Sequence, residues 1–136
     1  MRIILDSNIW VSFLLGFQRE FVRRVLTDPD IAVYVCPQLL NEIKDVASRP
    51  KIQNRIQPTD LEDMLNLIAI FCHNALIHHD AVSEVRDAKD LYLLSLAETI
   101  GAEYLVSGDI DLTDLQEHGV TRIVTLAEFK RRLLEF

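Results

Sequence analysis

The sequence is poor in the residues that mark disulfide-rich and low-complexity proteins. Its 136 residues include two cysteines, four glycines and four prolines. Cys36 and Cys72 lie in apolar stretches without a close Cys-x-x-Cys pair, so we expect buried thiols rather than a disulfide framework or a zinc cluster. No repeat or linker divides the chain, and 49% of its residues are hydrophobic. We therefore expect one compact domain over residues 1–136.

Long apolar runs and an excess of basic residues are also missing. The N-terminal run at residues 3–5 is too short for a signal peptide, and no later segment stays apolar long enough to cross a membrane. We expect a cytoplasmic protein without membrane association. The chain has 21 acidic and 14 basic residues, a formal net charge of −7. This charge is not typical of a nucleic-acid binder, unless several carboxylates gather at one site and are neutralised by a metal.

Short apolar runs alternate with segments of helical periodicity along the chain. Strands are predicted at residues 3–5, 31–36, 104–106 and 122–126, with a weaker candidate at 75–79. Helices are predicted at 9–15, 17–26, 37–48, from a capping box at 59–62 to about 72, at 88–100, and after a second capping box at 125–128. This alternation indicates an α/β fold with three layers, α/β/α, around a central parallel sheet.

In such sheets, ligands bind beyond the carboxyl ends of the strands, where the strand order reverses. Asp6 directly follows the first strand, and Asp109 follows the strand at 104–106 after a Ser-Gly turn. A turn or capping role explains either residue equally well when it is considered alone. Asp90 shares a helix face with Leu94 and Ala97, so its carboxylate requires a helix terminus, a counter-ion or a metal nearby.

Glu42 lies early in the helix at 37–48, at the margin of its apolar face. In isolation it is an ordinary solvated glutamate, and its interest comes from its place near the other three acids. Four carboxylates at one edge repel one another unless a cation intervenes. Oxygen ligands favour Mg²⁺, with Mn²⁺ as a close substitute, and such an ion suits the hydrolysis of a phosphodiester.

Six short motifs span nearly the whole chain: Ile4-Leu5-Asp6-Ser7-Asn8, Pro37-Gln38-Leu39-Leu40-Asn41-Glu42, Ser48-Arg49-Pro50-Lys51, Arg86-Asp87-Ala88-Lys89-Asp90, Gly101-Ala102-Glu103-Tyr104-Leu105-Val106-Ser107-Gly108-Asp109 and Ile123-Val124-Thr125-Leu126-Ala127-Glu128-Phe129. Each motif alone is weakly specific. In this order and at this spacing, they resemble the PIN domain, and more narrowly the VapC-like PIN toxins of toxin-antitoxin systems.

The resemblance implies an acidic quartet that binds Mg²⁺ or Mn²⁺ and orients the attacking water: Asp6, Glu42, Asp90 and Asp109. It implies supporting positions at Asn8, Ser107, Asp87 and Asp111, which rank below the quartet. The implied activity is cleavage of single-stranded RNA by a toxin, with a small antitoxin as its partner and a homodimer as its assembly.

Phosphate contacts are expected from basic residues in two groups: Arg19, Arg23, Arg24, Arg86 and Lys89 in the first, and Lys44, Arg49, Lys51 and Arg55 in the second. Solvated helix faces are the simpler interpretation of both groups. The three histidines at 73, 78 and 79 have no acidic or cysteine partner at ligand spacing, so we interpret them as surface or strand-end residues.

Two other functions stay open. A PIN fold could dock a partner protein or RNA without cutting it, and the acidic balance of the chain suits that interpretation. A phosphatase of the haloacid dehalogenase class also begins with an Asp after its first strand. That class has a second Asp two positions later, where this chain has Asn8.

Overall fold

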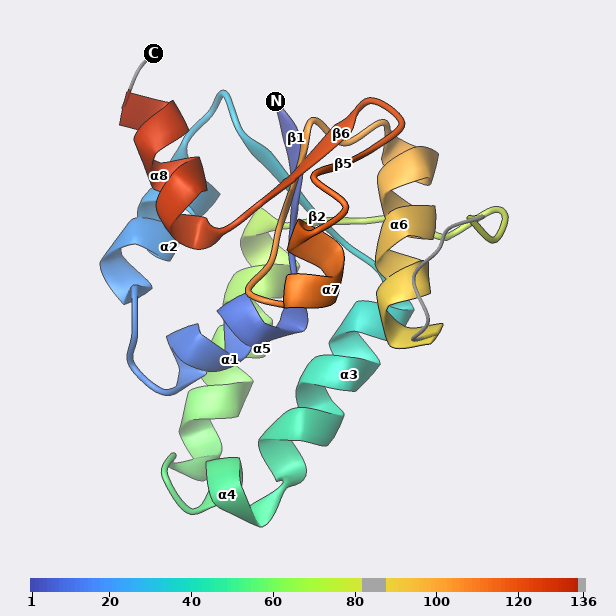
Figure 1. Ribbon diagram of the computed structural model, residues 1–136. Helices are drawn as coiled ribbons and strands as arrows, with labels where there is room; N and C mark the ends of the chain where they lie inside the picture. Colours follow the sequence, from blue (N-terminus) through green and yellow to red (C-terminus); the bar gives the residue numbers. More distant parts are fainter. Residues whose placement is uncertain (82–87, 135–136) are drawn as a thin grey trace.

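The computed structural model of the chain describes residues 1–81 and 88–134, with the side chains of the second range described from residue 90 onward (Figure 1). Its centre is a six-stranded sheet in the order β3-β2-β1-β4-β6-β5. The strands are β1 (Arg2–Leu5), β2 (Ala32–Val35), β3 (His73–Asn74), β4 (Tyr104–Val106), β5 (Glu117–His118) and β6 (Thr121–Val124). The helices are α1 (Ser7–Leu14), α2 (Arg19–Thr27), α3 (Pro37–Ser48), α4 (Pro50–Gln53), α5 (Pro58–Phe71), α6 (Ala88–Ile100), α7 (Ile110–Thr113) and α8 (Leu126–Leu134).

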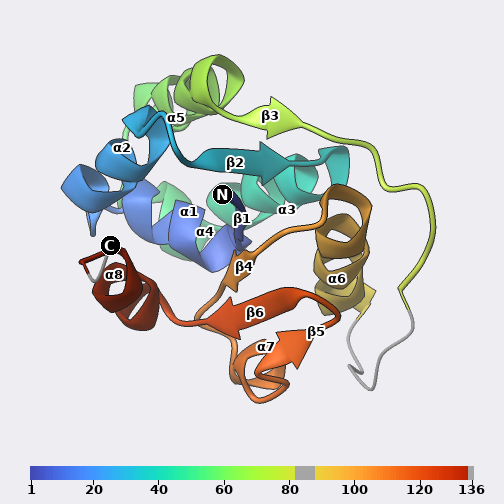
Figure 2. The ribbon, with the colours of Figure 1, turned by 90° about the horizontal axis from the view of Figure 1, so that it is seen from above.

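Helices cover both faces of the sheet, which confirms the predicted α/β/α fold class. Figure 2 shows α2 and α8 on one side of the central strands and α6 on the other. The central strands are apolar throughout, as a sheet covered on both faces requires: residues 3–5 of β1 and all of β4 are buried. Trp10 of α1 and Phe129 of α8 are the largest fully buried side chains. None of the described helices is long and apolar enough to cross a membrane.

One prediction about the sheet is wrong. The weak strand candidate at 75–79 is not a strand, because the pairing of β3 with β2 ends near Ala75, whose N–H donates to the carbonyl of Val35 at 2.9 Å. Beyond Val35 the neighbouring chain turns into α3 at Pro37 and offers no extended backbone to pair with. The other strand pairs are parallel, as predicted, and only the short edge strand β5 runs antiparallel to its neighbour β6.

Helix boundaries follow the predicted signals closely, with one change of register. Gly16 has a φ of 98° between α1 and α2, which explains the predicted break there. The capping box of α5 lies two residues earlier than predicted. The carboxylate of Asp60 accepts from the Gln57 backbone N–H at 2.8 Å, and Pro58 occupies the first helical turn. Cys36 and Cys72 are free thiols, the first buried and the second half-buried.

Candidate functional site

The strand order reverses between β1 and β4, at the centre of the sheet. From β1 the sheet extends to β2 and β3 on one side and to β4, β6 and β5 on the other. Leu5 pairs with Val106, and the backbone N–H of Asp6 donates to the carbonyl of Val106 at 2.9 Å. Ser107 continues the same edge, because its N–H donates to the carbonyl of Val124 at 2.9 Å. Asp6 and Ser107 therefore lie side by side at the carboxyl ends of neighbouring strands.

Asp6 is a buried carboxylate with several donors around it. It is 4% exposed, and it caps α1 by accepting from the N–H of Ser7 at 2.6 Å. Its other oxygen accepts from the Ser107 hydroxyl at 2.7 Å and from the Asn8 carboxamide at 3.4 Å. Burial raises the pKa of Asp6 in spite of these hydrogen bonds, and the charge of Glu42 raises it further. A positive charge beside Asp6 would lower its pKa again.

Glu42 reaches the same edge from α3. It is half-buried, and its carboxylate accepts a hydrogen bond from the hydroxyl of Tyr92 on α6. The pKa of Tyr92 is raised mainly by burial and, to a smaller extent, by the hydrogen bond to Glu42. The phenol therefore keeps its proton and acts as a donor. Tyr92 was not predicted as a site residue, because nothing in the sequence links it to Glu42, 50 residues away.

Three further carboxylates gather between the starts of α6 and α7. Oxygen atoms of Asp90, Asp109 and Asp111 all lie within 4.8 Å of one another. Asp90 is 7% exposed, which confirms that it faces inward with Leu94 and Ala97. Asp109 caps the short helix α7 by accepting from the N–H of Asp111 at 2.9 Å. This group, which we call the Asp trio, includes Asp111, whereas the prediction ranks Asp111 below the quartet.

Ser107 joins the Asp trio to the pair formed by Asp6 and Glu42. Its hydroxyl is fully buried, donates to Asp6 and accepts from the backbone N–H of Asp109 at 3.0 Å. Asn8 makes a second link, since its side-chain oxygen accepts from the N–H of Gly108 at 3.3 Å. We call Asp6, Glu42 and the Asp trio together the acidic edge. The supporting positions expected at Asn8 and Ser107 thus make hydrogen bonds within the acidic edge.

The other expected site residues lie apart from this edge or outside the described part. Arg86 and Asp87 lie outside the described residues, as does the side chain of Lys89. Arg19 donates to the carbonyls of Phe13 and Leu14 at 2.8 and 3.0 Å, and Arg23 lies over the Phe13 ring. These contacts stabilise the end of α1.

The second basic group lies mainly on the exposed surface of α3 and α4. Lys44, Arg49, Lys51 and Arg55 are all exposed. Arg49 pairs with Asp45 of the preceding helical turn at 3.2 Å. Nothing in these contacts distinguishes the group from an ordinary solvated helix face.

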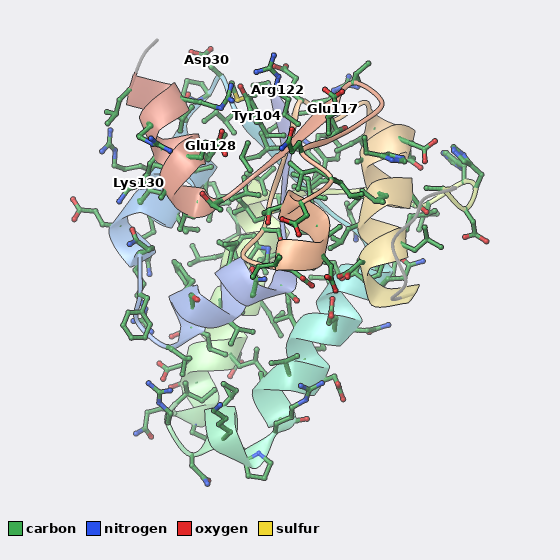
Figure 3. All side chains as sticks on the ribbon, viewed as in Figure 1. Asp30, Tyr104, Glu117, Arg122, Glu128 and Lys130 are labelled. Carbon is green, nitrogen blue, oxygen red and sulfur yellow. The ribbon has the colours of Figure 1, made fainter. Side chains whose placement is uncertain are left out.

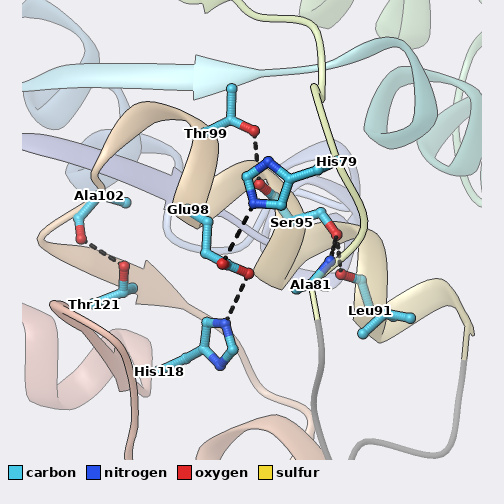
Figure 4. A network of polar contacts seen from close by, with 9 residues as sticks. All are labelled: His79, Ala81, Leu91, Ser95, Glu98, Thr99, Ala102, His118 and Thr121. Atoms are coloured by element: carbon cyan, nitrogen blue, oxygen red, sulfur yellow. Dashed lines mark hydrogen bonds and ion pairs between the residues drawn. The ribbon is translucent and has the colours of Figure 1, made fainter.

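Two histidines contact a glutamate that the sequence did not indicate as their partner. The two carboxylate oxygens of Glu98 each contact one histidine: Oε1 lies 3.4 Å from Nε2 of His79, and Oε2 lies 3.1 Å from Nε2 of His118 (Figure 4). The hydrogen bonds from these two rings, His118 first, lower the pKa of Glu98. His79 is exposed, as predicted, and its acidic partner Glu98 lies 19 residues away in the sequence, outside ligand spacing. The three residues come from separate elements, so no local spacing could have revealed them.

The fold and its acidic edge define the class of protein, and the comparison of sequences identifies the family. The profile of the PIN domain matches residues 2–111, so the chain belongs to the PIN domain family. The haloacid dehalogenase alternative is accordingly not supported. No curated protein sequence matches the chain.

Two solved structures resemble the fold. One is a chain of VapBC2 from Rickettsia felis, solved bound to a DNA fragment from the promoter of its genes. It aligns with a TM-score of 0.59 at 15% identity over 90% of this chain and 98% of that chain. The other is the PIN domain of RRP44 from T. brucei, with a TM-score of 0.49 at 13% identity over 98% of this chain and 79% of that chain.

Proposed function

We propose that this PIN domain is a metal-dependent endoribonuclease with its site at the acidic edge. The observation that carries the proposal is the Asp trio at the point where the strand order reverses, beside the buried carboxylate of Asp6. Carboxylates so close together repel one another and are stabilised by a cation. The acidic residues we assign to catalysis and metal binding are Asp6, Glu42, Asp90 and Asp109, with Asp111 as a further candidate ligand.

The donor set fits a hard divalent cation. The candidate ligand atoms are carboxylate oxygens, which suit Mg²⁺ or Mn²⁺. When bound at such a site, the ion supplies Lewis acidity and a water of lowered pKa for attack on a phosphodiester. The protein orients the carboxylates: Ser107 and Asn8 hold Asp6, and Tyr92 holds Glu42. Fixed carboxylates of this kind support an in-line displacement without rearrangement of the site.

The resemblance to VapC-like toxins supports a more specific biological role. We propose that the protein is the toxin of a toxin-antitoxin pair, that a small antitoxin binds it, and that it forms a homodimer in the cytoplasm. We also propose that residues 1–136 form one domain, because one cluster of buried apolar residues extends from β1 to α8. Arg86 and Lys89 are the proposed phosphate contacts nearest to Asp90 in sequence, and Arg19 and Arg23 are more distant candidates.

Cleavage of single-stranded RNA by the purified chain tests the nuclease proposal. We expect cleavage with Mg²⁺ or Mn²⁺, none with EDTA, and a loss of about a hundredfold in the Asp90→Asn and Asp6→Asn variants. Asp63→Asn changes an exposed acid on α5 and serves as the control. Unchanged activity in both site variants would refute the assignment. Tight RNA binding without cleavage would support the docking interpretation instead.

A further inference from the structure

The proposed nuclease leaves one polar cleft unexplained, on the outer side of β6. It has a volume of about 410 Å³ and lies between α7, the turn that leads into β5, β6 itself and the start of α8. Figure 3 labels Glu117 and Arg122 at the β5–β6 end of the cleft and Glu128 at the start of α8. We propose that this cleft holds a nucleobase of single-stranded RNA next to the phosphodiester at the acidic edge. The proposal rests on the proposed function.

Charged groups of both signs line the cleft, and their numbers are equal. Arg122 and Arg132 contribute guanidinium groups, whereas Glu117 and Glu128 contribute carboxylates. A phosphate subsite would have an excess of basic groups, and a cation site would have an excess of acidic groups. A nucleobase is neutral and has donors and acceptors side by side along its edge, which carboxylate, amide and guanidinium groups recognise.

Arg132 is positioned for recognition by its existing contacts. Its guanidinium pairs with Glu128 at 3.2 Å and lies 5.8 Å from the centre of the Tyr104 ring. Its Nε atom is buried and has no hydrogen-bond partner in the described part of the chain. Glu128 raises the pKa of Arg132, so the group remains a cation and a donor. A planar guanidinium held in place can stack against a base as well as donate to it.

The cleft is connected to the acidic edge by two short links. The hydroxyl of Thr113, which lines the cleft, donates to the carbonyl of Asp109 at 3.2 Å, so one turn of α7 separates the cleft from the Asp trio. One helical turn is about 5.4 Å long. Val124 lines the cleft as well, and its carbonyl accepts from the N–H of Ser107. A base in the cleft would therefore belong to a nucleotide directly beside the phosphodiester at the edge.

Nucleotide binding can be measured independently of cleavage. The full chain, ¹⁵N-labelled and in EDTA, is titrated with each of the four ribonucleoside 5′-monophosphates and with inorganic phosphate. We expect the amide signals of Thr113, Arg122 and Thr125 to shift with at least one nucleotide and not with phosphate. Arg122→Ala changes an exposed strand residue and should weaken binding about tenfold. Arg131→Ala, which changes an exposed arginine of α8 that does not line the cleft, should leave it unchanged.

The possible outcomes test the proposed nucleobase cleft and the proposed nuclease activity separately. Nucleotide binding in the Asp90→Asn variant, together with no RNA cleavage by the wild type, would support the cleft and reject the nuclease. Normal RNA cleavage by Arg122→Ala at unchanged positions, with no nucleotide-dependent shifts in the wild type, would overturn the cleft alone. Equal shifts with inorganic phosphate and with the nucleotides would also overturn it, because they would indicate recognition of phosphate rather than of a base.

Discussion

The two ends of α6 place carboxylates in opposite surroundings. Near its start, Asp90 lies with Asp109 and Asp111, and carboxylate oxygens of all three residues are within 4.8 Å of one another. Two turns later, Glu98 lies between His79 and His118 (Figure 4). Glu98 has two histidine partners, whereas the Asp trio brings three carboxylates together. Glu98 is therefore paired within the fold, and the trio is the group to which we assign the proposed cation-binding role.

The pKa values of Asp6 and Glu98 are shifted in opposite directions. Burial raises the pKa of Asp6, whereas hydrogen bonds from His118 and His79 lower that of Glu98. Asp6 is buried in spite of this cost in desolvation, which is typical of carboxylates at functional sites. The variants that follow test this difference between the carboxylates of the acidic edge and Glu98.

Ser107→Ala should have the largest effect among the positioning variants. The change removes the donor to Asp6 and the acceptor for the Asp109 N–H from the buried centre of the acidic edge. We expect RNA cleavage to fall by about 10- to 100-fold and the free energy of unfolding by about 1.5–3 kcal/mol. Steady-state kinetics and urea unfolding measure the two effects. Ser48→Ala, on the exposed end of α3, is the control, and equal kinetics in both variants would contradict the bridging role of Ser107.

Tyr92→Phe should have a smaller effect on the same reaction. It removes the hydroxyl that donates to Glu42 and keeps the aromatic ring. Because Glu42 is only half-buried, water can replace the lost donor, and we expect kcat to fall by about tenfold or less. Tyr34→Phe on β2 is the matched control. A kcat equal to that of the wild type would show that Tyr92 does not position Glu42.

Glu98→Gln should leave cleavage unchanged and alter only the dependence of stability on pH. The lowered pKa means that ionised Glu98 stabilises the fold above its ordinary pKa of 4.5, and that this contribution is lost as the pH falls through the lowered value. The variant should unfold at a lower temperature than the wild type above pH 4.5, and this difference should shrink as the pH falls below 4.5. Thermal unfolding at several pH values measures it, and a constant difference across this range would argue against the ion-pair account.

Sequence patterns predicted the parts of the fold that depend on local periodicity. The apolar runs of β1 and β4 and the glycines that follow α1 and α6 act within a few residues, and the structure has these elements as expected. The strand candidate at 75–79 failed because its pairing depends on where β2 ends, which is a property of a distant segment. The antiparallel strand β5 and the short helices α4 and α7 are too brief for a periodic signal.

The acidic edge was predictable in part for the same reason. Asp6 and Asp109 follow strands, and Asp90 interrupts an apolar helix face, so each has a local signal. The bond between Tyr92 and Glu42 and the contacts of Glu98 join residues far apart in the chain. The proximity of Asp111 to Asp90 likewise depends on how α7 sits against α6.

Calorimetric titration with Mn²⁺ tests the central claim most directly, because it measures binding at the acidic edge without a substrate. We expect saturable binding to the wild type, about 10- to 100-fold weaker binding in Asp90→Asn and Asp109→Asn, and no change in Glu98→Gln or Asp63→Asn. Absence of binding to the wild type at millimolar Mn²⁺, or a loss of binding in Glu98→Gln with the two Asp variants unaffected, would contradict the metal site.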